Sequence, residues 1–439
     1  MIKLSSYKIL EILGVSQTVA ETEISNVSTD SRQVSKETLF IALKGEKFDG
    51  HDFILEVLAK GVPLVVAERH IEGADEKRVI VVEDSLKAFG LLGQYNRRQY
   101  KGTVIALTGS SGKTTTKEEL KAALSQYAPT YATSGNFNNF IGVPRSLLDI
   151  DMNSKYAIIE MGMSAPKEID YLVHLTEPDV ALVTNVYPMH IEFLKTTENI
   201  AKAKAEIFSG LKKGGIAVYN EDALHAEILK AAAEKVTNKI YGFGKNHHAE
   251  VKLNLSEEGE HFYYNAWAVL AVISALGLDL APAVEAVNHF TAPEGRGKRY
   301  NVSLGGRKIT LIDNSYSGGP DATVLAVESL GKMNVTGRKI AVIGKMAELG
   351  DYTKEAHVRV GKALAENHIN VVIGVCEETK DVLAQLPSSV EQHYFENIEG
   401  VSAFLQDKVL QNGDAVLIKG SHYSSQVYKA AAELKSHAV

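Results

Sequence analysis

A glycine-rich turn between an apolar segment and a helix-like segment constrains this chain more than any other feature. Residues 103–108 read TVIALT, and the turn 109–112 reads GSSG before the sequence KTTT. Glycines let backbone N–H groups curl around an anion, and the first turn of the following helix adds its partial positive charge. A strand, an anion-binding turn and a helix in this order begin a βαβ unit, which predicts a parallel sheet.

The side chains of the turn are those of a nucleotide triphosphate site. Lys113 is placed to reach the outer phosphates, and the Thr114 hydroxyl is a ligand for magnesium. Leu107 stands where the longer form of this loop carries its first glycine, so the loop is the short T-G-x-x-G-K-T-T form. We expect ATP to bind through the loop residues Gly109, Ser110, Ser111, Gly112, Lys113, Thr114 and Thr115.

Apolar segments of strand length recur along the chain and alternate with helix-length segments. This alternation predicts a parallel sheet in each of two successive α/β units. The first hundred residues carry short strands and one amphipathic segment, 53–60, and are expected to form a smaller α/β unit. The later strands are expected at 156–162, 179–186 and 215–220 in one unit, and at 309–315, 339–344, 370–375 and 415–421 in the other.

The length of the chain agrees with three domains of ordinary size. The chain has 439 residues, and about 150 residues is a typical domain. The turn-rich segment 292–300 carries proline, two glycines and three basic residues, so we place a hinge there. The predicted domains are 1–100, 101–293 and 294–439.

Charge and composition exclude several classes of protein. The formal net charge of −7 provides no basic field, so no nucleic-acid partner is expected. The single cysteine cannot form an internal disulfide, and the N-terminus lacks the apolar core of a signal peptide, which favours a cytoplasmic protein. No apolar run approaches the roughly 18–20 residues that cross a bilayer, so no membrane insertion is expected.

Glu160 and His190 each follow a predicted strand. The carboxyl ends of parallel strands meet at one edge of a sheet, so both side chains are expected beside the phosphate loop. A carboxylate there would complete the oxygen shell of a magnesium ion that the loop threonine begins. Two other interpretations stay open: Glu160 in a surface ion pair, and His190 as a helix cap or a packed imidazole. Lys202 and Lys204, on a helix predicted at 199–211, cannot be told apart by spacing.

With these residues assembled, the chain resembles the Mur ligase superfamily nearly end to end. The patterns DGHDF and GNxNNxxGVP favour the branch that adds a dipeptide to a nucleotide-linked tripeptide. The segments that carry the resemblance are 28–54, 108–118, 135–148, 185–194, 203–208 and 343–350.

The resemblance implies a three-domain α/β ligase. A small N-terminal α/β domain would hold the UDP end, a central P-loop domain with a parallel sheet would hold ATP, and a C-terminal Rossmann-like domain would close over both. The implied reaction is ATP-dependent ligation of D-alanyl-D-alanine to UDP-N-acetylmuramoyl-tripeptide through an acyl phosphate, in peptidoglycan precursor synthesis. We expect the protein to be a monomer. Two alternatives stay open: another amide ligase of the superfamily, such as a tripeptide-forming ligase or a folylpolyglutamate synthase, and a nucleotide-binding protein without ligase activity.

The resemblance also implies two magnesium ions. Thr114 and Glu160 would hold the first, and His190 with a carbamylated Lys204 would hold the second. Carbamylation turns a cationic amine into an anionic oxygen ligand, which is the form that suits a cation. The resemblance, and not the spacing, therefore selects Lys204. The implied catalytic residues are Lys113, Glu160, His190 and Lys204.

Contacts to ATP are implied as well. Asn265 resembles the asparagine that contacts adenine, and Asp313 with Tyr316 resembles the ribose and phosphate contact of the closing domain. Arg296 and Lys298, in the predicted hinge, would neutralise the transferred phosphate. A solvated linker charge is the alternative for Arg296.

Five further residues are candidates for the other substrate. Ser31 and Arg32 would contact the uridine diphosphate group. Asn136, Asn138 and Asn139 would line the channel of the peptide carboxylate, with a turn-rich loop as the alternative.

The chain departs from the family pattern in the closing domain. Residues 313–320 read DNSYSGGP where the pattern is D-D-S-Y-N-A-N-P. Lys345 stands where an acidic residue is usual, and His422 where arginine often follows K-G-S. The segment 243–261 is also short, so a hairpin of the middle domain is expected to be missing.

Overall fold

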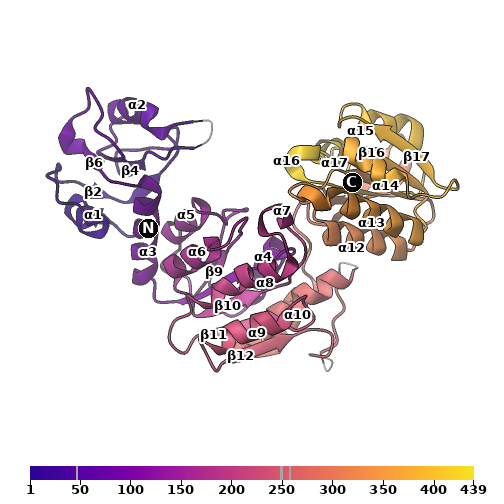
Figure 1. Cartoon of the computed structure of the whole chain (residues 1–439), viewed down its shortest axis with the longest axis horizontal. Coiled ribbons are helices and arrows are strands. Elements are labelled where there is room, and N and C mark those ends of the chain that lie inside the picture. Colours follow the sequence, from indigo (N-terminus) through magenta and orange to yellow (C-terminus); the bar gives the residue numbers. More distant parts are fainter. Residues whose placement is uncertain (46–47, 248–250, 257–258) are drawn as a thin grey trace.

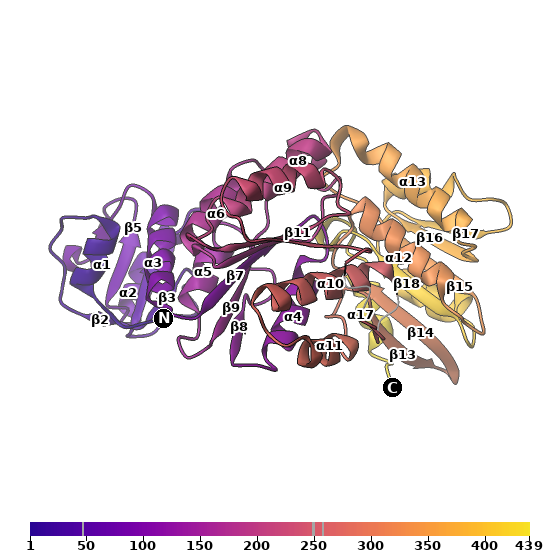
Figure 2. The same ribbon diagram turned by 90° about the horizontal axis from the view of Figure 1, so that it is seen from below.

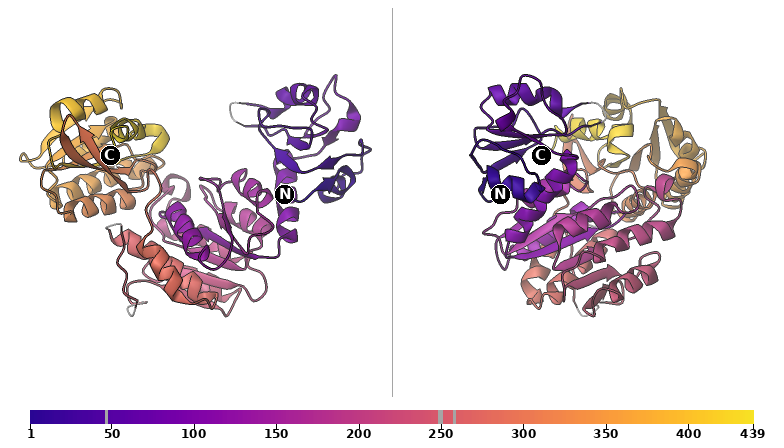
Figure 3. Two further views of the ribbon diagram at one scale, coloured as in Figure 1. Left: turned by 180° about the vertical axis from the view of Figure 1, so that it is seen from behind. Right: turned by 60° about the vertical axis from the view of Figure 1, so that its left-hand side comes forward.

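The computed structural model describes residues 1–45, 48–247, 251–256 and 259–439. Within these residues the strands form one four-stranded sheet, two six-stranded sheets and one two-stranded pair. Figure 1 shows the three larger sheets following one another along the chain, with the N-terminal and C-terminal units on either side of the middle unit. In the view from behind, these two outer units rise from the same side of the middle unit (Figure 3). The expected three-domain α/β architecture is confirmed.

The N-terminal unit is built on short parallel strands. The sheet has the order β3 (Asn26–Ser28), β4 (Thr38–Ile41), β5 (Leu64–Ala67), β6 (Val79–Val81), with helices α1 (Ser6–Leu13), α2 (Ile54–Ala59) and α3 (Ser85–Gln99). Strands β4 and β5 are buried along their whole length, as parallel strands covered on both faces are. β1 (Leu4–Ser5) and β2 (Glu23–Ile24) form the separate antiparallel pair. Residues 46–47 of the matching segment 28–54 lie outside the described residues.

The middle unit holds a six-stranded sheet in which all neighbouring strands are parallel. The order is β12 (Ile240–Phe243), β11 (Ile216–Asn220), β10 (Val180–Val183), β7 (Thr103–Thr108), β9 (Tyr156–Glu160), β8 (Thr130–Ala132). One face packs on α5 (Gly142–Leu148), α6 (Glu168–Thr176), α8 (Thr197–Ala205) and α9 (Ala226–Glu234), and the other on α4 (Lys113–Leu124), α10 (Glu260–Ala275) and α11 (Leu280–Asn288) (Figure 2). From β7 the chain first adds β8 and β9 on one side and then β10, β11 and β12 on the other, so the strand order reverses at β7. Open parallel sheets bind ligands beyond the carboxyl ends of the strands at such a reversal.

The C-terminal unit holds the second six-stranded sheet. Its order is β13 (Lys298–Leu304), β14 (Arg307–Asn314), β18 (Ala415–Lys419), β15 (Lys339–Gly344), β16 (Val371–Val375), β17 (Glu391–Phe395). Its helices are α12 (Pro320–Lys332), α13 (Thr353–Glu366), α14 (Lys380–Leu383), α15 (Val401–Phe404), α16 (His422–Ser425) and α17 (Tyr428–Lys435). β13 pairs with β14 antiparallel, and the other pairs are parallel. Every strand expected in the two later units is present.

The hinge is shorter than the sequence predicted. The turn-rich segment was expected to extend over 292–300, but β13 already begins at Lys298. A turn at Gly305 and Gly306 lets β13 fold back directly on β14, so this strand needs no crossover helix. Across the described ranges no helix is long and apolar enough to cross a membrane.

Candidate active site

The phosphate loop lies at the carboxyl end of β7, where α4 begins. Gly112 has a φ of 76°, and a Cβ atom there would lie 2.7 Å from Asn265 Oδ1. Any other residue at this position would be strained and crowded. The inner face of α4 is buried at Leu120, Ala123 and Leu124.

Lys113 lies among the charged groups of the loop. Its ammonium group donates a hydrogen bond to the backbone oxygen of Gly109 at 2.7 Å. Burial lowers the pKa of Lys113; the nearby Glu160 carboxylate opposes this shift, and the Arg296 guanidinium adds to it. The predicted strand, turn and helix are therefore present, with the lysine directed at the loop.

Glu160 ends β9 inside the protein, with 1% of its surface exposed. Its Oε1 atom accepts hydrogen bonds from Asn138 Nδ2 at 2.8 Å and from the Thr114 hydroxyl at 3.3 Å. Among the described residues no group hydrogen-bonds to its Oε2 atom, and the Lys117 ammonium lies 3.9 Å away. The structure brings Thr114 and Glu160 together, and the burial of Glu160 excludes a surface ion pair.

Arg296 connects the hinge to the phosphate loop. Its Nη2 atom donates to the Thr114 hydroxyl at 3.1 Å, and its guanidinium carbon lies 3.9 Å from the centre of the Tyr316 ring. Burial lowers the pKa of Arg296, and the Glu160 carboxylate opposes that shift. An arginine with these partners is not a solvated linker charge.

Lys204 is buried, with 2% of its surface exposed, on the same helix as the exposed Lys202. Lys202 pairs with Glu198 at 2.6 Å. Burial holds the pKa of Lys204 well below its usual value, and the positive charge of Lys113 lowers it further. Within the described part of the chain, the Lys204 ammonium has no hydrogen-bond or ion-pair partner. A lowered pKa favours the neutral amine, which is the form that can add carbon dioxide, so Lys204 fits the expected carbamate.

His190 has a partner from the other domain. It precedes the short helix α7 (Ile191–Leu194) with a φ of 57°. Its Nδ1 atom lies against a carboxylate oxygen of Glu348, and this contact lowers the pKa of Glu348. The sequence predicted His190 as a magnesium ligand and did not predict Glu348, although Glu348 lies in the matching segment 343–350.

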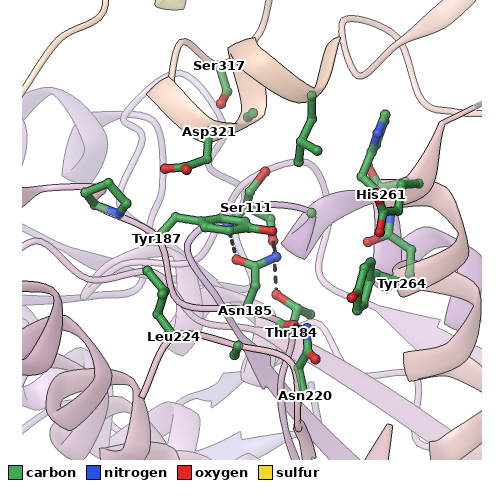
Figure 4. Close-up of a pocket in the computed structure, with 18 of the residues that line it drawn as sticks. Ser111, Thr184, Asn185, Tyr187, Asn220, Leu224, His261, Tyr264, Ser317 and Asp321 are labelled. Atoms are coloured by element: carbon green, nitrogen blue, oxygen red, sulfur yellow. Dashed lines mark hydrogen bonds between the residues drawn. The ribbon is translucent and has the colours of Figure 1, made fainter. Parts of the chain in front are cut away.

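A cavity of about 610 Å³ lies between the middle and C-terminal units beside the phosphate loop. Figure 4 shows Asn185 and Asn220 on one side of it and Ser317 and Asp321 on the other. The Asn185 amide bonds both the N–H and the carbonyl oxygen of Ser111, at 2.8 and 2.9 Å, and so holds the loop to this wall. The predicted ATP-binding residues that line the cavity are Ser111, Gly112, Thr115, Asn265 and Arg296.

Helix α10 presents Asn265 and His261 to the cavity. Asn265 Oδ1 accepts a hydrogen bond from the Thr116 hydroxyl at 3.1 Å, which leaves the amide N–H₂ group as a donor. Burial and the charge of Lys419 lower the pKa of His261 to about 4. Burial and the charge of Arg296 lower the pKa of Lys419 itself to about 7. Lys419 is therefore only partly protonated near pH 7.

The closing-domain segment places Asn314, and not Asp313, at the cavity. Asp313 is 2% exposed, and its Oδ1 atom accepts a hydrogen bond from the Ser315 hydroxyl at 2.6 Å. In the β13–β14 ladder Asp313 lies opposite Lys298, so both of these predicted nucleotide contacts are part of the sheet. Side chains alternate between the faces of a strand, which explains why the next residue faces the ligand space. Tyr316 supports Arg296 instead of lining the cavity.

Asp321 was not predicted from the sequence. It lies in the first turn of α12, after Pro320, and lines the cavity. Its Oδ1 atom bonds Arg359 at 2.7 Å, while its Oδ2 atom is buried and has no hydrogen-bond partner among the residues described. Such an oxygen is an acceptor for a ligand hydroxyl group. Asp321 could have been predicted from its position, because it is a carboxylate that directly follows the closing-domain motif at 313–320.

The residues predicted for the UDP group lie in the N-terminal unit, outside this cavity. The Arg32 guanidinium bonds the Asp30 carboxylate at 2.9 and 2.8 Å and lowers the pKa of Asp30 to about 2. The Ser31 carbonyl oxygen accepts a hydrogen bond from Lys60 at 3.1 Å. Both residues belong to the turn between β3 and β4.

The three predicted asparagines are used differently. Asn138 bonds Glu160, as described above. Asn139 Oδ1 accepts hydrogen bonds from the N–H groups of Ile141 and Gly142 and thereby starts α5. Asn136 is exposed. The turn-rich-loop interpretation therefore accounts for Asn139, whereas Asn138 belongs to the site.

Comparison with protein-family models covers the three units in turn. The model of the Mur ligase family catalytic domain matches residues 23–95. The Mur ligase middle domain matches 107–278, and the Mur ligase glutamate ligase domain matches 298–422.

Relatives and solved structures agree with these matches. The UDP-N-acetylmuramoyl-tripeptide–D-alanyl-D-alanine ligase of Bacillus subtilis (strain 168) is 33% identical over 426 residues, covering 91% of this chain and 91% of the relative. The ligase of the same name from Escherichia coli (strain K12) is 32% identical over 445 residues, covering 96% of each. MurF from Acinetobacter baumannii has a TM-score of 0.88 at 29% identity over 99% of each chain. MurF ligase from Thermotoga maritima in complex with ADP has a TM-score of 0.81 at 27% identity, covering 94% of this chain and 97% of that one. The chain therefore belongs to the Mur ligase family, within the group of the UDP-N-acetylmuramoyl-tripeptide–D-alanyl-D-alanine ligases.

Proposed function

We propose that this chain is an ATP-dependent ligase that joins D-alanyl-D-alanine to UDP-N-acetylmuramoyl-tripeptide in peptidoglycan precursor synthesis. One observation carries the proposal: the Thr114 hydroxyl of the phosphate loop is hydrogen-bonded to both Glu160 and Arg296. A hydroxyl, a carboxylate and a guanidinium group thus meet where the outer phosphates of ATP would lie. The names of the relatives supply the substrates, and the ADP complex of the Thermotoga maritima protein supports ATP as the nucleotide.

The reaction joins a carboxylate to an amine through an acyl phosphate. The tripeptide carboxylate attacks the γ-phosphorus of ATP, the bond to the bridging oxygen breaks, and ADP leaves. The dipeptide amine then attacks the acyl carbon, loses a proton, and displaces inorganic phosphate. Lys113 and Arg296 offset the negative charge on the transferred phosphate, and domain closure brings the substrates together.

The side chains fit the two magnesium ions that the family implies. Thr114 and Glu160 offer oxygen ligands, and the buried Glu160 Oε2 atom has no hydrogen-bond partner within the described residues. Carbon dioxide would add to the neutral Lys204 amine with loss of a proton, and the resulting carbamate would hold the second ion with His190. His190 would first leave Glu348. Magnesium, when bound, supplies positive charge at the phosphates.

The remaining assignments place the substrates on the three domains. Asn265 contacts adenine, and Asp321, in place of Asp313, accepts from the ribose. Ser31 and Arg32 contact the uridine diphosphate group, and Asn138 the peptide carboxylate. The protein acts as a cytoplasmic monomer, with domains at 1–100, 101–293 and 294–439.

The test is phosphate release from ATP by the purified protein with the tripeptide nucleotide and D-alanyl-D-alanine, each omitted in turn. The expected result is release that needs all three, with a pentapeptide nucleotide as the product by mass. Release with a single amino acid in place of the dipeptide would indicate a sibling ligase. Nucleotide binding without release under any of these conditions would refute ligase activity.

A further inference from the structure

Lys117 is a buried lysine that the proposed reaction does not use. It lies one turn after Lys113 on α4, and its relative exposure is 0%. Its ammonium group donates to the carbonyl oxygens of Thr133 at 2.6 Å and Gly135 at 2.8 Å, and lies 3.0 Å from the Glu118 carboxylate. Burying a charged amine is unfavourable unless such partners surround it. These partners together suggest that the position requires a cationic donor.

The same ammonium group faces the Glu160 carboxylate. Lys117 Nζ lies 3.9 Å from Glu160 Oε2, while Oε1 is occupied by hydrogen bonds from Asn138 and Thr114. Oε2 therefore has a positive charge nearby but, among the residues described, no hydrogen bond. A carboxylate oxygen that is held in place without a hydrogen bond is open to coordinate a cation.

The two carbonyl groups that Lys117 holds belong to the segment that positions Glu160 from its other side. The Thr133 hydroxyl oxygen accepts a hydrogen bond from the Glu160 N–H at 3.1 Å. Asn138, three residues after Gly135, bonds the Glu160 side chain. Lys117 thus joins α4, the segment 133–138 and the end of β9 at one point.

Charge alone does not explain this arrangement. A lysine beside a carboxylate repels a metal ion that binds the same carboxylate, so its electrostatic effect on metal binding is unfavourable. Its two hydrogen bonds to carbonyl groups act in the other direction, because they hold the ligand and its neighbours in one orientation.

We propose that Lys117 is a positioning residue that fixes the Glu160 carboxylate and the segment 133–138 in the orientation that binds a divalent cation at the phosphate loop. This inference rests on the proposed function, because it takes Glu160 as a ligand of that cation. The competing account is a lysine that only fastens the segment to α4 without any effect on metal binding.

The test uses the full chain, a non-hydrolysable ATP analogue and calorimetric titrations at increasing Mg²⁺. Lys117→Met is expected to need about tenfold more Mg²⁺ than the wild type for half-maximal binding, since partners of metal ligands commonly change metal affinity by that factor. Lys117→Arg keeps the charge and is expected to need an intermediate amount. Affinity for the analogue without Mg²⁺ is expected to stay unchanged. Lys121→Met, an exposed lysine on the same helix, is the matched control and is expected to resemble the wild type.

Three results would overturn the proposal. They are an unchanged Mg²⁺ requirement in Lys117→Met, a lowered one, and a loss of metal-free affinity as large as the loss with Mg²⁺. If Lys117→Met does not fold, Lys117→Arg carries the test, and a wild-type Mg²⁺ requirement in that variant overturns the proposal. A wild-type protein that binds the analogue with Mg²⁺ but performs no ligation would refute the proposed function alone, because the binding titrations would still decide the role of Lys117.

Discussion

The middle and C-terminal domains both present the carboxyl ends of parallel strands to the cavity, but the side chains at these two edges have different partners. In the middle domain, Thr114 and Asn138 both donate hydrogen bonds to Glu160 beside the phosphate loop. In the C-terminal domain, Asp321 is bonded to Arg359 of its own domain, and its other carboxylate oxygen has no hydrogen-bond partner among the described residues. The folding of one domain builds the phosphate half of the site, and the placement of a second domain adds the rest.

Two of the contacts between these domains involve residues of the site. Arg296, from the hinge, bonds Thr114, and His190 of the middle domain lies against Glu348 of the C-terminal domain. If the middle domain provides the groups at the phosphates and the C-terminal domain adds contacts to the rest of the nucleotide, substitutions in the two domains should differ. Those in the middle domain should mainly lower the rate of the chemical step, and those in the C-terminal domain should mainly lower nucleotide affinity.

The largest effect is expected for Lys204→Ala. We expect turnover to fall by about a thousandfold, because the variant loses a buried group that the metal centre is proposed to need. The measurement is phosphate release with all substrates present. Lys202→Ala, two residues away on the exposed face of the same helix, is the control and should turn over like the wild type. Near wild-type turnover of Lys204→Ala would contradict the assignment of Lys204 as a carbamate.

Arg296→Lys should have the next largest effect. Lysine cannot both stack on Tyr316 and reach Thr114 with a planar group, so we expect kcat to fall by about a hundredfold, with a smaller change in KM for ATP. Tyr316→Phe keeps the ring beneath the cation and should preserve most of the activity. A change confined to KM in Arg296→Lys would show that the arginine contributes to nucleotide affinity and not to the chemical step.

Asp321→Ala should act on binding. We expect KM for ATP to rise about tenfold, which corresponds to about 1.4 kcal/mol, while kcat changes little. Deoxy-ATP lacks a ribose hydroxyl, so the wild type should have a higher KM for deoxy-ATP than for ATP. The variant should have nearly the same KM for both nucleotides. Asp351→Asn, at an exposed aspartate of the same domain, is the control. If the ratio of KM for deoxy-ATP to KM for ATP is the same in Asp321→Ala as in the wild type, Asp321 does not bind the ribose hydroxyl.

The smallest effect concerns the protonation of Lys419. Its pKa is about 7 in the folded protein, against an ordinary value of 10.5. Between these two values the unfolded chain binds the proton and the folded chain does not, so this group makes folding more favourable as pH rises through that window. The melting temperature of the wild type should therefore rise relative to that of Lys419→Met between pH 7 and pH 9. An equal difference at both pH values would show that Lys419 is charged in the folded protein.

The predictable parts of the molecule were those whose signals are adjacent in the chain. The strand, turn and helix around Lys113 follow one another without a gap, and so do the apolar strands of both later sheets. The antiparallel strand β13 was not predicted, because its residues resemble a linker until the pairing with β14 is known. Lys204 could be separated from Lys202 only through the family resemblance, and burial now gives the physical reason.

The contacts that could not be predicted join distant segments. Glu348 meets His190 only because two domains are packed together, and nothing near either residue indicates this contact. Asp313 was expected at the nucleotide from its motif, and the alternation of side chains along β14 places the next residue, Asn314, among those that line the cavity. The sequence does not distinguish Lys117 from other lysines on helices, because its carbonyl partners lie in a different segment of the chain.

The position of Arg296 in the linker has a mechanical consequence. A body that turns about a joint moves least at the joint and most at its far rim. Arg296 lies at the joint between the middle and C-terminal domains, so its guanidinium group travels a short arc when the C-terminal domain swings. Asp321, on α12, belongs to the domain that swings, so any rotation shifts it relative to the middle domain. The charge proposed to act at the phosphate thus stays close to the axis, whereas the proposed ribose acceptor moves with the C-terminal domain.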